Sequence, residues 1–199
     1  MDSTNVYCLP SRLAPLSPDP SDGAAIRAAA RQVASCVSVI TVGSGKARAA
    51  LTTLSVSLLS ADPATLILCV NRAFAGYAAF ARSRRFAVNV LGGDQREIAE
   101  RLASPTGGSD GGIFDGRWLP LADDLECLAD CAAVFECEIE EIMDRHANAV
   151  VIGRVLRALT GGGSALVRWR GVYDQLGWSQ NEILRAVGLR PVADAQERS

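Results

Sequence analysis

Short apolar segments, each ended by a glycine, proline or charged break, constrain the fold of this chain more than any other feature. These segments are rich in Val, Ile, Leu and Thr and follow one another over most of the 199 residues. They occupy residues 36–42, 47–60, 65–71, 85–91, 132–144, 148–159 and 165–173. Strands joined by short turns favour antiparallel pairing, and repeated β–α–β crossovers are not evident. The sequence therefore predicts a mostly β protein whose strands, about six or seven, form a small barrel.

Three segments of helical composition interrupt the predicted strands. They are the alanine-rich residues 23–35, which we expect Asp22 to cap, the short residues 74–83, and the charged residues 95–103. Four prolines before residue 21 exclude continuous helix there. The predicted organisation is an irregular arm at 1–20, one domain at 21–177, and a tail at 178–199 with a short helix.

The composition argues against several classes of function. Lys and Arg total 20 against 22 Asp and Glu, so there is no basic field to hold a nucleic acid. No uncharged apolar stretch approaches the ~20 residues that cross a bilayer. The six cysteines lie mostly in apolar segments, which is typical of reduced thiols in a cytoplasmic protein. Cys127 and Cys131, with one histidine in the chain, do not predict a zinc site, and we expect no metal.

Familiar nucleotide and nucleophile motifs fail. Gly43-Ser44-Gly45-Lys46 resembles the end of a phosphate loop, but Ile40 stands where the leading glycine belongs and Ala47 replaces the Ser or Thr. A Ser-His-Asp or Cys-His arrangement would have to pass through His146, the single histidine. Nucleotide use in this chain must therefore occur without a glycine loop.

Three groups of segments occur together in an order and spacing that match one known family. They are VASCVSVITV at 33–42 with ALTTLSVSLLSADPATLILCVN at 50–71, FAVNVL at 86–91 with the helical segment from Gln95, and DRHANAVVIGRV at 144–155 with GVYDQLG at 171–177. Together they span residues 24–177. The combination resembles the flavin reductase family with the FMN-binding split-barrel fold. Members of this family are the small reductase components of two-component flavin-dependent monooxygenases.

The resemblance implies both a fold and an activity. The fold is an antiparallel six-stranded split β-barrel of Greek-key type, decorated by short helices. The activity is hydride transfer from NADH or NADPH to FMN or FAD, which supplies reduced flavin to a separate oxygenase component. The resemblance also implies a homodimer with flavin near the subunit interface. Ala50, Leu54, Ala64 and the pair Asp144-Arg145 depart from the family pattern, and the choice between the flavins and between the nucleotides stays open.

Four hydroxyl side chains lie close together in the segment that resembles the family's flavin-binding strand. If residues 52–57 form one strand, Thr53, Ser55 and Ser57 point to one face and Thr52 points to the other. Small hydroxyls can approach the edge of a flavin ring and its ribityl chain. The alternative is that threonine is simply a good strand former and that exposed serine is ordinary. With the resemblance, we predict that these four residues bind flavin.

The next candidate site is the turn formed by Asn71, Arg72, Ala73, Phe74 and Ala75, between an apolar strand and a helix. Backbone N–H groups at a helix start, helped by a guanidinium, can hold a phosphate. In the family this turn corresponds to the flavin phosphate site. The alternative is a solvated loop with one surface arginine.

His146 is the candidate catalytic residue. It occupies the predicted hairpin turn at which the family places a histidine near the nicotinamide. There it can donate a hydrogen bond to the dinucleotide without acting as a proton donor in the reaction. Hydride transfer needs stacked rings rather than a protein nucleophile, because the cofactors bring the reactivity. Two alternatives remain: a reductase with another acceptor such as a corrinoid, and a non-catalytic flavin-binding module.

Overall fold

A computed structural model describes residues 23–44, 48–74, 76–103, 117–122 and 124–177. The predicted arm at 1–20 and the predicted tail at 178–199 lie outside these ranges, as does residue 75. The described chain is mostly antiparallel β structure with three short helices, as expected. None of its helices is long and apolar enough to cross a membrane.

The largest sheet has seven strands in the order β3-β2-β6-β9-β10-β5-β4, and every neighbouring pair is antiparallel. Its strands are β2 (Ser38–Val42), β3 (Ala49–Thr53), β4 (Ser57–Ala61), β5 (Ala64–Asn71), β6 (Arg85–Val90), β9 (Ala133–Arg145) and β10 (Asn148–Thr160). Apolar side chains on both faces, as in β2 where all five residues are buried, explain the near-continuous apolar segments of the sequence.

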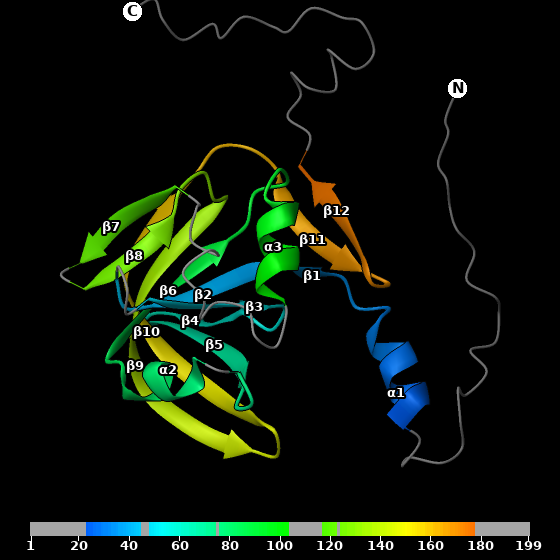
Figure 1. The fold of residues 1–199 in the computed structure, drawn as a ribbon, viewed down its shortest axis with the longest axis horizontal. Coiled ribbons are helices and arrows are strands. Elements are labelled where there is room, and N and C mark those ends of the chain that lie inside the picture. Colours follow the sequence, from blue (N-terminus) through cyan, green and yellow to red (C-terminus); the bar gives the residue numbers. More distant parts are fainter. Residues whose placement is uncertain (1–22, 45–47, 75, 104–116, 123, 178–199) are drawn as a thin grey trace, which may run out of the picture.

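This sheet curls until its two ends approach each other (Figure 1). β3 and β4 stand at opposite ends of the strand order, yet only Leu54, Ser55 and Val56 separate them. The four steps from Thr53 to Ser57 can span at most about 14 Å, so the first and last strands must lie near each other. No ladder pairs β3 with β4 in the described chain. The sheet is therefore a curled open sheet of seven strands, and a closed six-stranded barrel is not observed.

The predicted hairpin around His146 is confirmed. β9 and β10 are each 13 residues long and pair from Arg145↔Asn148 to Ala133↔Thr160, with two register shifts. Their turn is His146-Ala147, with His146 in the left-handed region at φ 53°. β10 also pairs with β5, and Asn148 stands opposite Asn71. The histidine turn therefore lies beside the end of β5.

Two smaller sheets complete the β structure. β1 (Ser35–Cys36), β11 (Ala165–Trp169) and β12 (Val172–Leu176) form one sheet, and β7 (Trp118–Ala122) and β8 (Leu125–Leu128) form the other. The prediction of a single strand at 165–173 is wrong, because Arg170 and Gly171 adopt positive φ values of 51° and 84° and reverse the chain. The β7–β8 hairpin was not predicted from the sequence.

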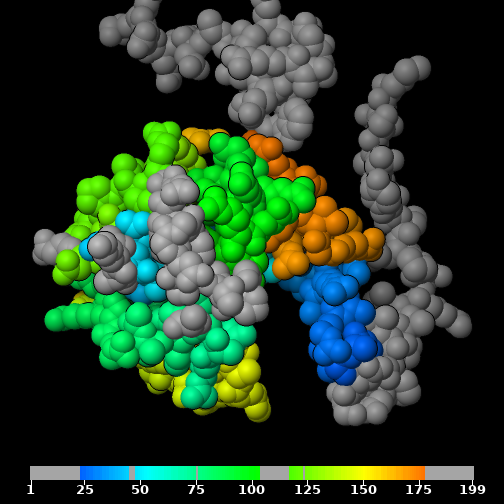
Figure 2. Space-filling view, viewed as in Figure 1, coloured from blue at the N-terminus to red at the C-terminus, as the bar shows by residue number. Residues whose placement is uncertain are grey.

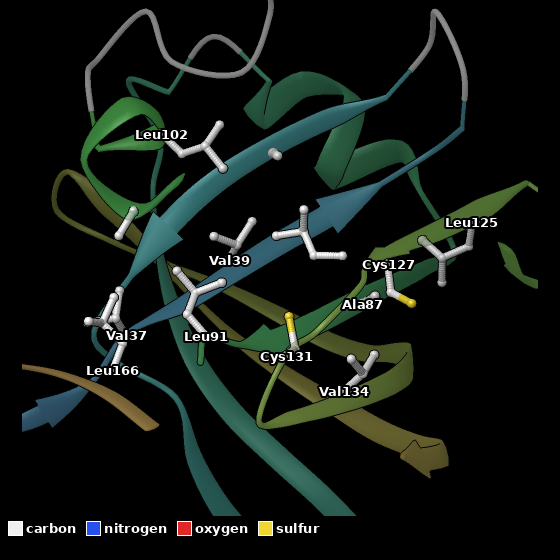
Figure 3. Close-up of a cluster of buried hydrophobic side chains, with 13 residues drawn as sticks. Val37, Val39, Ala87, Leu91, Leu102, Leu125, Cys127, Cys131, Val134 and Leu166 are labelled. Atoms are coloured by element: carbon white, nitrogen blue, oxygen red, sulfur yellow. The ribbon is translucent and has the colours of Figure 1, made fainter. Parts of the chain in front are cut away.

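Two of the three helices contribute side chains to the two buried clusters of the protein. α3 (Arg96–Leu102) places Ala99 and Leu102 in a cluster that also includes Val39 of β2 and Leu166 of β11 (Figure 3). α2 (Tyr77–Arg82) contributes Phe80 to the second cluster, where its ring centroid lies 5.7 Å from that of Phe86. By contrast α1 (Gly23–Ala30) has no buried residue and stands apart from the large sheet (Figure 1).

Candidate functional site

A cavity of about 210 Å³ opens where the edge strand β3, the end of β5 and the end of α3 meet. Its lining residues are Leu51, Thr52, Asn71, Ala73, Phe74, Leu102 and Ala103. Three of these, Leu51, Phe74 and Leu102, offer apolar surface, while Thr52 and Asn71 offer hydrogen-bonding groups. An apolar cavity with a few polar side chains suits an aromatic ring with a polar edge.

Thr52 is the one predicted hydroxyl residue that lines this cavity. It is half-buried, and its Oγ1 donates a hydrogen bond to the carbonyl oxygen of Ala99 in α3 at 3.1 Å. That bond fixes the side chain and joins β3 to α3. The remaining acceptor capacity of the hydroxyl oxygen is available to a ligand.

The other three hydroxyl residues have different positions. The prediction of one continuous strand through residues 52–57 is wrong, because β3 ends at Thr53 and β4 begins at Ser57. Ser55 Oγ accepts a hydrogen bond from the backbone N–H of Cys69 at 2.9 Å and donates one to its carbonyl oxygen at 3.1 Å. Thr53 Oγ1 lies 2.9 Å from Ser55 Oγ. Thr53 and Ser55 thus satisfy the backbone of β5 at Cys69, just beyond the β4–β5 ladder. Ser57 is exposed and starts the edge strand β4.

In the turn after β5, the backbone N–H groups already have acceptors. The Arg72 N–H donates to the Ala147 carbonyl at 2.9 Å, that of Ala73 to Asn71 Oδ1 at 2.9 Å, and that of Phe74 to the Asn71 carbonyl at 3.1 Å. Ala75 lies outside the described residues. The expected phosphate seat from backbone N–H groups is therefore not available at residues 72–74. Arg72, between the lining residues Asn71 and Ala73, is the cationic residue of this turn.

A polar network joins Arg72 to the histidine turn. One Arg72 nitrogen lies 3.2 Å from Asp144 Oδ2, and another donates to the His146 carbonyl at 3.4 Å. Tyr77 donates its phenol O–H to Asp144 Oδ1 at 3.2 Å. Partial burial, together with the Asp144 carboxylate, raises the pKa of Tyr77, so that the phenol stays protonated at neutral pH. The network holds the cation and the turn in one arrangement.

His146 lies next to the cavity without lining it. Its side chain is exposed at the tip of the β9–β10 hairpin, and its backbone contacts Arg72, whose neighbours Asn71 and Ala73 line the cavity. The structure thus brings together Thr52, the 71–74 turn and His146, while Thr53 and Ser55 bond to Cys69.

Sequence analysis missed several residues of this site. Leu51, Leu102 and Ala103 line the cavity, but apolar residues in a strand and a helix carry no signal beyond core formation. Asp144 and Tyr77 were also missed. Asp144 was noted only as a departure from the family pattern. The sequence signal that could have found them is an acidic residue two positions before the hairpin histidine, together with an arginine in a neighbouring turn.

Neither the cysteines nor other ligand types form a metal centre in the parts of the chain that the structure describes, where no three His, Cys, Asp or Glu residues gather. Cys127 and Cys131 are both buried in the Val39 cluster. Burial raises the pKa of Cys131 to about 12, so that this thiol is protonated at neutral pH.

The residues at the cavity fit a flavin. The apolar walls of Leu51, Phe74 and Leu102 can contact a planar ring, Thr52 and Asn71 can bond its polar edge, and Arg72 can pair with a phosphate. The fold is thus a curled antiparallel β protein with a cavity whose lining suits an aromatic ring.

The chain belongs to the family described as flavin reductase like domain, whose model matches residues 30–177. FMN reductase (NADH) RutF 1 of Methylorubrum extorquens is 37% identical over 131 residues, which is 64% of this chain and 62% of that relative. The chain thus spans about three fifths of the length of the curated relatives it matches.

Two solved structures share the fold. A putative flavin reductase from Haemophilus somnus is similar with a TM-score of 0.73 and 26% identity, over 78% of this chain and 99% of that chain. BorF, the flavin reductase component of a bacterial two-component tryptophan halogenase, gives a TM-score of 0.71 and 28% identity, over 79% of this chain and 100% of that chain.

Proposed function

We propose that this protein is an NAD(P)H:flavin oxidoreductase that transfers a hydride from NADH to FMN or FAD and supplies reduced flavin to a separate monooxygenase. The observation that carries the proposal is the cavity lined by Thr52 and Asn71, next to which Arg72 contacts the His146 turn. Support comes from relatives named FMN reductase (NADH) and from a relative named as the reductase component of a flavin-dependent monooxygenase.

The chain's own residues have distinct roles in this proposal. Bound flavin supplies the acceptor for the hydride of the dihydronicotinamide. Thr52 and Asn71 orient the polar edge of the ring, and Arg72 pairs with the phosphate. His146 contacts the dinucleotide from its exposed turn and orders it without passing a proton. Thr53 and Ser55 act indirectly, because their bonds to Cys69 fix the position of the strand end that carries Thr52.

The predicted domain at 21–177 forms the family's split barrel in this proposal, and the protein is a cytoplasmic homodimer. Two leucines of the edge strand β4 support dimerisation, because Leu58 is 60% exposed and Leu59 is 53% exposed beside unpaired backbone groups. The five described cysteines are free thiols, which fits a reducing compartment. The mass in solution, measured for the wild type and Leu58→Glu, tests the dimer.

Anaerobic mixing tests the activity. The full chain is mixed with FMN or FAD and then with NADH or NADPH, while the flavin absorption band is followed. We expect NADH to bleach the band much faster with the protein than without it. A stable flavin complex that no nucleotide bleaches would instead indicate a non-catalytic flavin-binding module. Bleaching of bound flavin with transfer only to a corrinoid would indicate a different acceptor.

A further inference from the structure

A second cavity, of about 450 Å³, lies between α1 and the β11–β12 hairpin. Four arginines line it, namely Arg27, Arg31, Arg168 and Arg170, with Ala30, Val33, Ser35, Leu54 and Gly171 between them. In the space-filling view a hollow separates α1, in blue, from the body of the molecule (Figure 2). We call this cavity the arginine pocket.

Among the described residues, no carboxylate pairs with the arginines of the arginine pocket. None of its lining residues is Asp or Glu, and none of the ion pairs among the described residues involves any of the four arginines. Like charges gathered around one cavity repel each other, and this repulsion is relieved when an anion enters. The pocket is therefore electrostatically prepared for an anionic ligand.

Arg168 carries an unsatisfied hydrogen-bond donor. Its Nε is buried and has no hydrogen-bond partner, although buried donors of folded proteins are nearly always paired. The guanidinium stacks on the ring of Tyr173, its cross-strand neighbour, with 5.4 Å from Cζ to the ring centroid. Stacking fixes the guanidinium plane while leaving its N–H groups for a ligand.

Hydrogen bonds fix the opposite wall of the pocket. The Arg170 N–H donates to the Arg31 carbonyl at 2.9 Å, and Trp169 Nε1 donates to the Gln32 carbonyl at 3.2 Å. Arg170 Nε donates to Gln32 Oε1 at 2.8 Å. These bonds join the end of the α1 segment to the hairpin tip. They also occupy two carbonyl oxygens whose partial negative charge would otherwise oppose an anion.

The arginine pocket adjoins the first cavity, lined by Thr52 and Asn71, which we call the flavin cavity after the proposed function. Leu54 lines the arginine pocket, and Thr52, two residues earlier, lines the flavin cavity. Two residues of extended chain separate their Cα atoms by about 7 Å. A ligand that places a ring beside Thr52 can thus extend a second charged half past the end of β3.

We propose that the arginine pocket binds the adenosine phosphate half of a dinucleotide that the reductase uses. This inference rests on the proposed function. Guanidinium groups recognise phosphate through paired N–H donors, and the pocket volume falls within the range of small-ligand sites. Two ligands of the proposed reaction carry an adenosine phosphate group: FAD, in its adenylate half, and the nicotinamide dinucleotide, in its adenosine half.

The first test measures binding alone. ADP is titrated calorimetrically into the full chain, as wild type and as Arg27→Gln, Arg168→Gln and Arg82→Gln. Arg82, at the end of α2, is the charge-matched control outside the pocket. We expect each pocket variant to weaken ADP binding at least tenfold and Arg82→Gln to leave it unchanged. Because α1 has no buried residue, Arg27→Gln keeps the test valid if Arg168→Gln fails to fold.

The second test identifies the source. If FAD supplies the adenylate, the pocket variants raise the KM for FAD and leave that for FMN unchanged; if the nicotinamide dinucleotide supplies it, the KM for NADH or NADPH rises instead. Unchanged ADP affinity in both pocket variants, or no saturable ADP binding by the wild type, overturns the proposal. ADP binding does not require hydride transfer. If the protein binds ADP through these arginines but never reduces flavin, the proposed reductase activity is refuted while the proposed ADP site stands.

Discussion

Two groups of arginines in this protein have opposite surroundings. On the large sheet, Arg84 and Arg154 both pair with Glu138, while Arg85 and Arg157 both pair with Glu136. Four arginines line the arginine pocket, and none pairs with a carboxylate in the described chain. Arg27 of the pocket belongs to α1 and Arg168 to β11, whereas the paired arginines lie on or next to strands of the large sheet.

The difference indicates which charges serve the fold and which serve a ligand. A carboxylate shared by two guanidiniums fixes neighbouring strands, here β6, β9 and β10, and leaves few N–H groups for other partners. A guanidinium without a carboxylate partner keeps N–H groups for a ligand, although Arg168 also stacks on Tyr173 and Arg170 bonds to Gln32. Arg72 is intermediate, because it pairs with Asp144 and yet its side chain is 43% exposed, between two residues that line the flavin cavity.

Removing the cations around Glu136 gives the largest expected effect. The Glu136 side chain is only 7% exposed, and Arg85→Ala with Arg157→Ala leaves its carboxylate without a cation. We expect the free energy of unfolding to fall by about 2 kcal/mol, less than for a fully buried pair because both arginines are half-exposed. Urea denaturation measures this change.

A compensating variant is the control for that experiment. Adding Glu136→Leu to the two arginine substitutions removes the stranded charge, and most of the lost stability should return. A triple variant no more stable than the double variant would show that the arginines act through packing rather than charge.

Arg72→Gln is expected to affect ligand binding more than stability. The substitution removes the cation that we propose to pair with the flavin phosphate, while Asp144 keeps its bond from Tyr77. One charge-assisted bond to phosphate corresponds to a roughly tenfold weaker affinity for FMN. Fluorescence quenching of FMN on titration measures the affinity, with Arg82→Gln as control. A normal FMN affinity would place the phosphate elsewhere.

The strands that could be predicted are those with an uninterrupted apolar pattern. β2, β5, β6 and the β9–β10 hairpin follow directly from such segments and from the breaks beside them. The break at residues 54–56 could not be predicted, since Leu-Ser-Val contains no glycine or proline and fits a strand locally. At residues 54–56 the chain passes from one end of the strand order to the other because the sheet curls, which is a long-range effect.

The site shows the same limit. Thr52, Asn71, Ala73 and Phe74 line the flavin cavity as predicted candidates, whereas Thr53 and Ser55 bond to Cys69 instead. Alternation along one strand could not reveal this, because β3 ends at Thr53 and Ser55 lies opposite Cys69 in continuation of the β4–β5 pairing, in which Ser57 pairs with Ile67. The arginine pocket could likewise not be predicted from the sequence. Its arginines come from the segment of α1 and from the β11–β12 hairpin, and the two groups are at least 137 residues apart, which is the separation of Arg31 and Arg168.

His146→Asn tests the histidine turn with a smaller effect. Asparagine tolerates the left-handed φ of 53° at this position, so the hairpin should be kept. We expect the KM for NADH to rise several-fold, about 1 kcal/mol of lost interaction, while the affinity for FMN is unchanged. Steady-state kinetics with each substrate varied in turn gives both values. A loss of FMN affinity with normal KM for NADH would reassign the histidine to the flavin.

Glu138 gives the smallest effect and a definite dependence on pH. Hydrogen bonds from Arg154 and Arg84 lower the pKa of this carboxyl below its ordinary value of 4.5. The ionised form is therefore favoured in the folded state, so the contribution to stability is present above about pH 4.5 and is lost as the pH falls through the folded-state pKa. Urea midpoints of the wild type and Glu138→Gln should differ at pH 7, and the difference should be smaller at pH 3. A constant difference at both pH values would mean that the guanidiniums respond to the shape of the side chain and not to its charge.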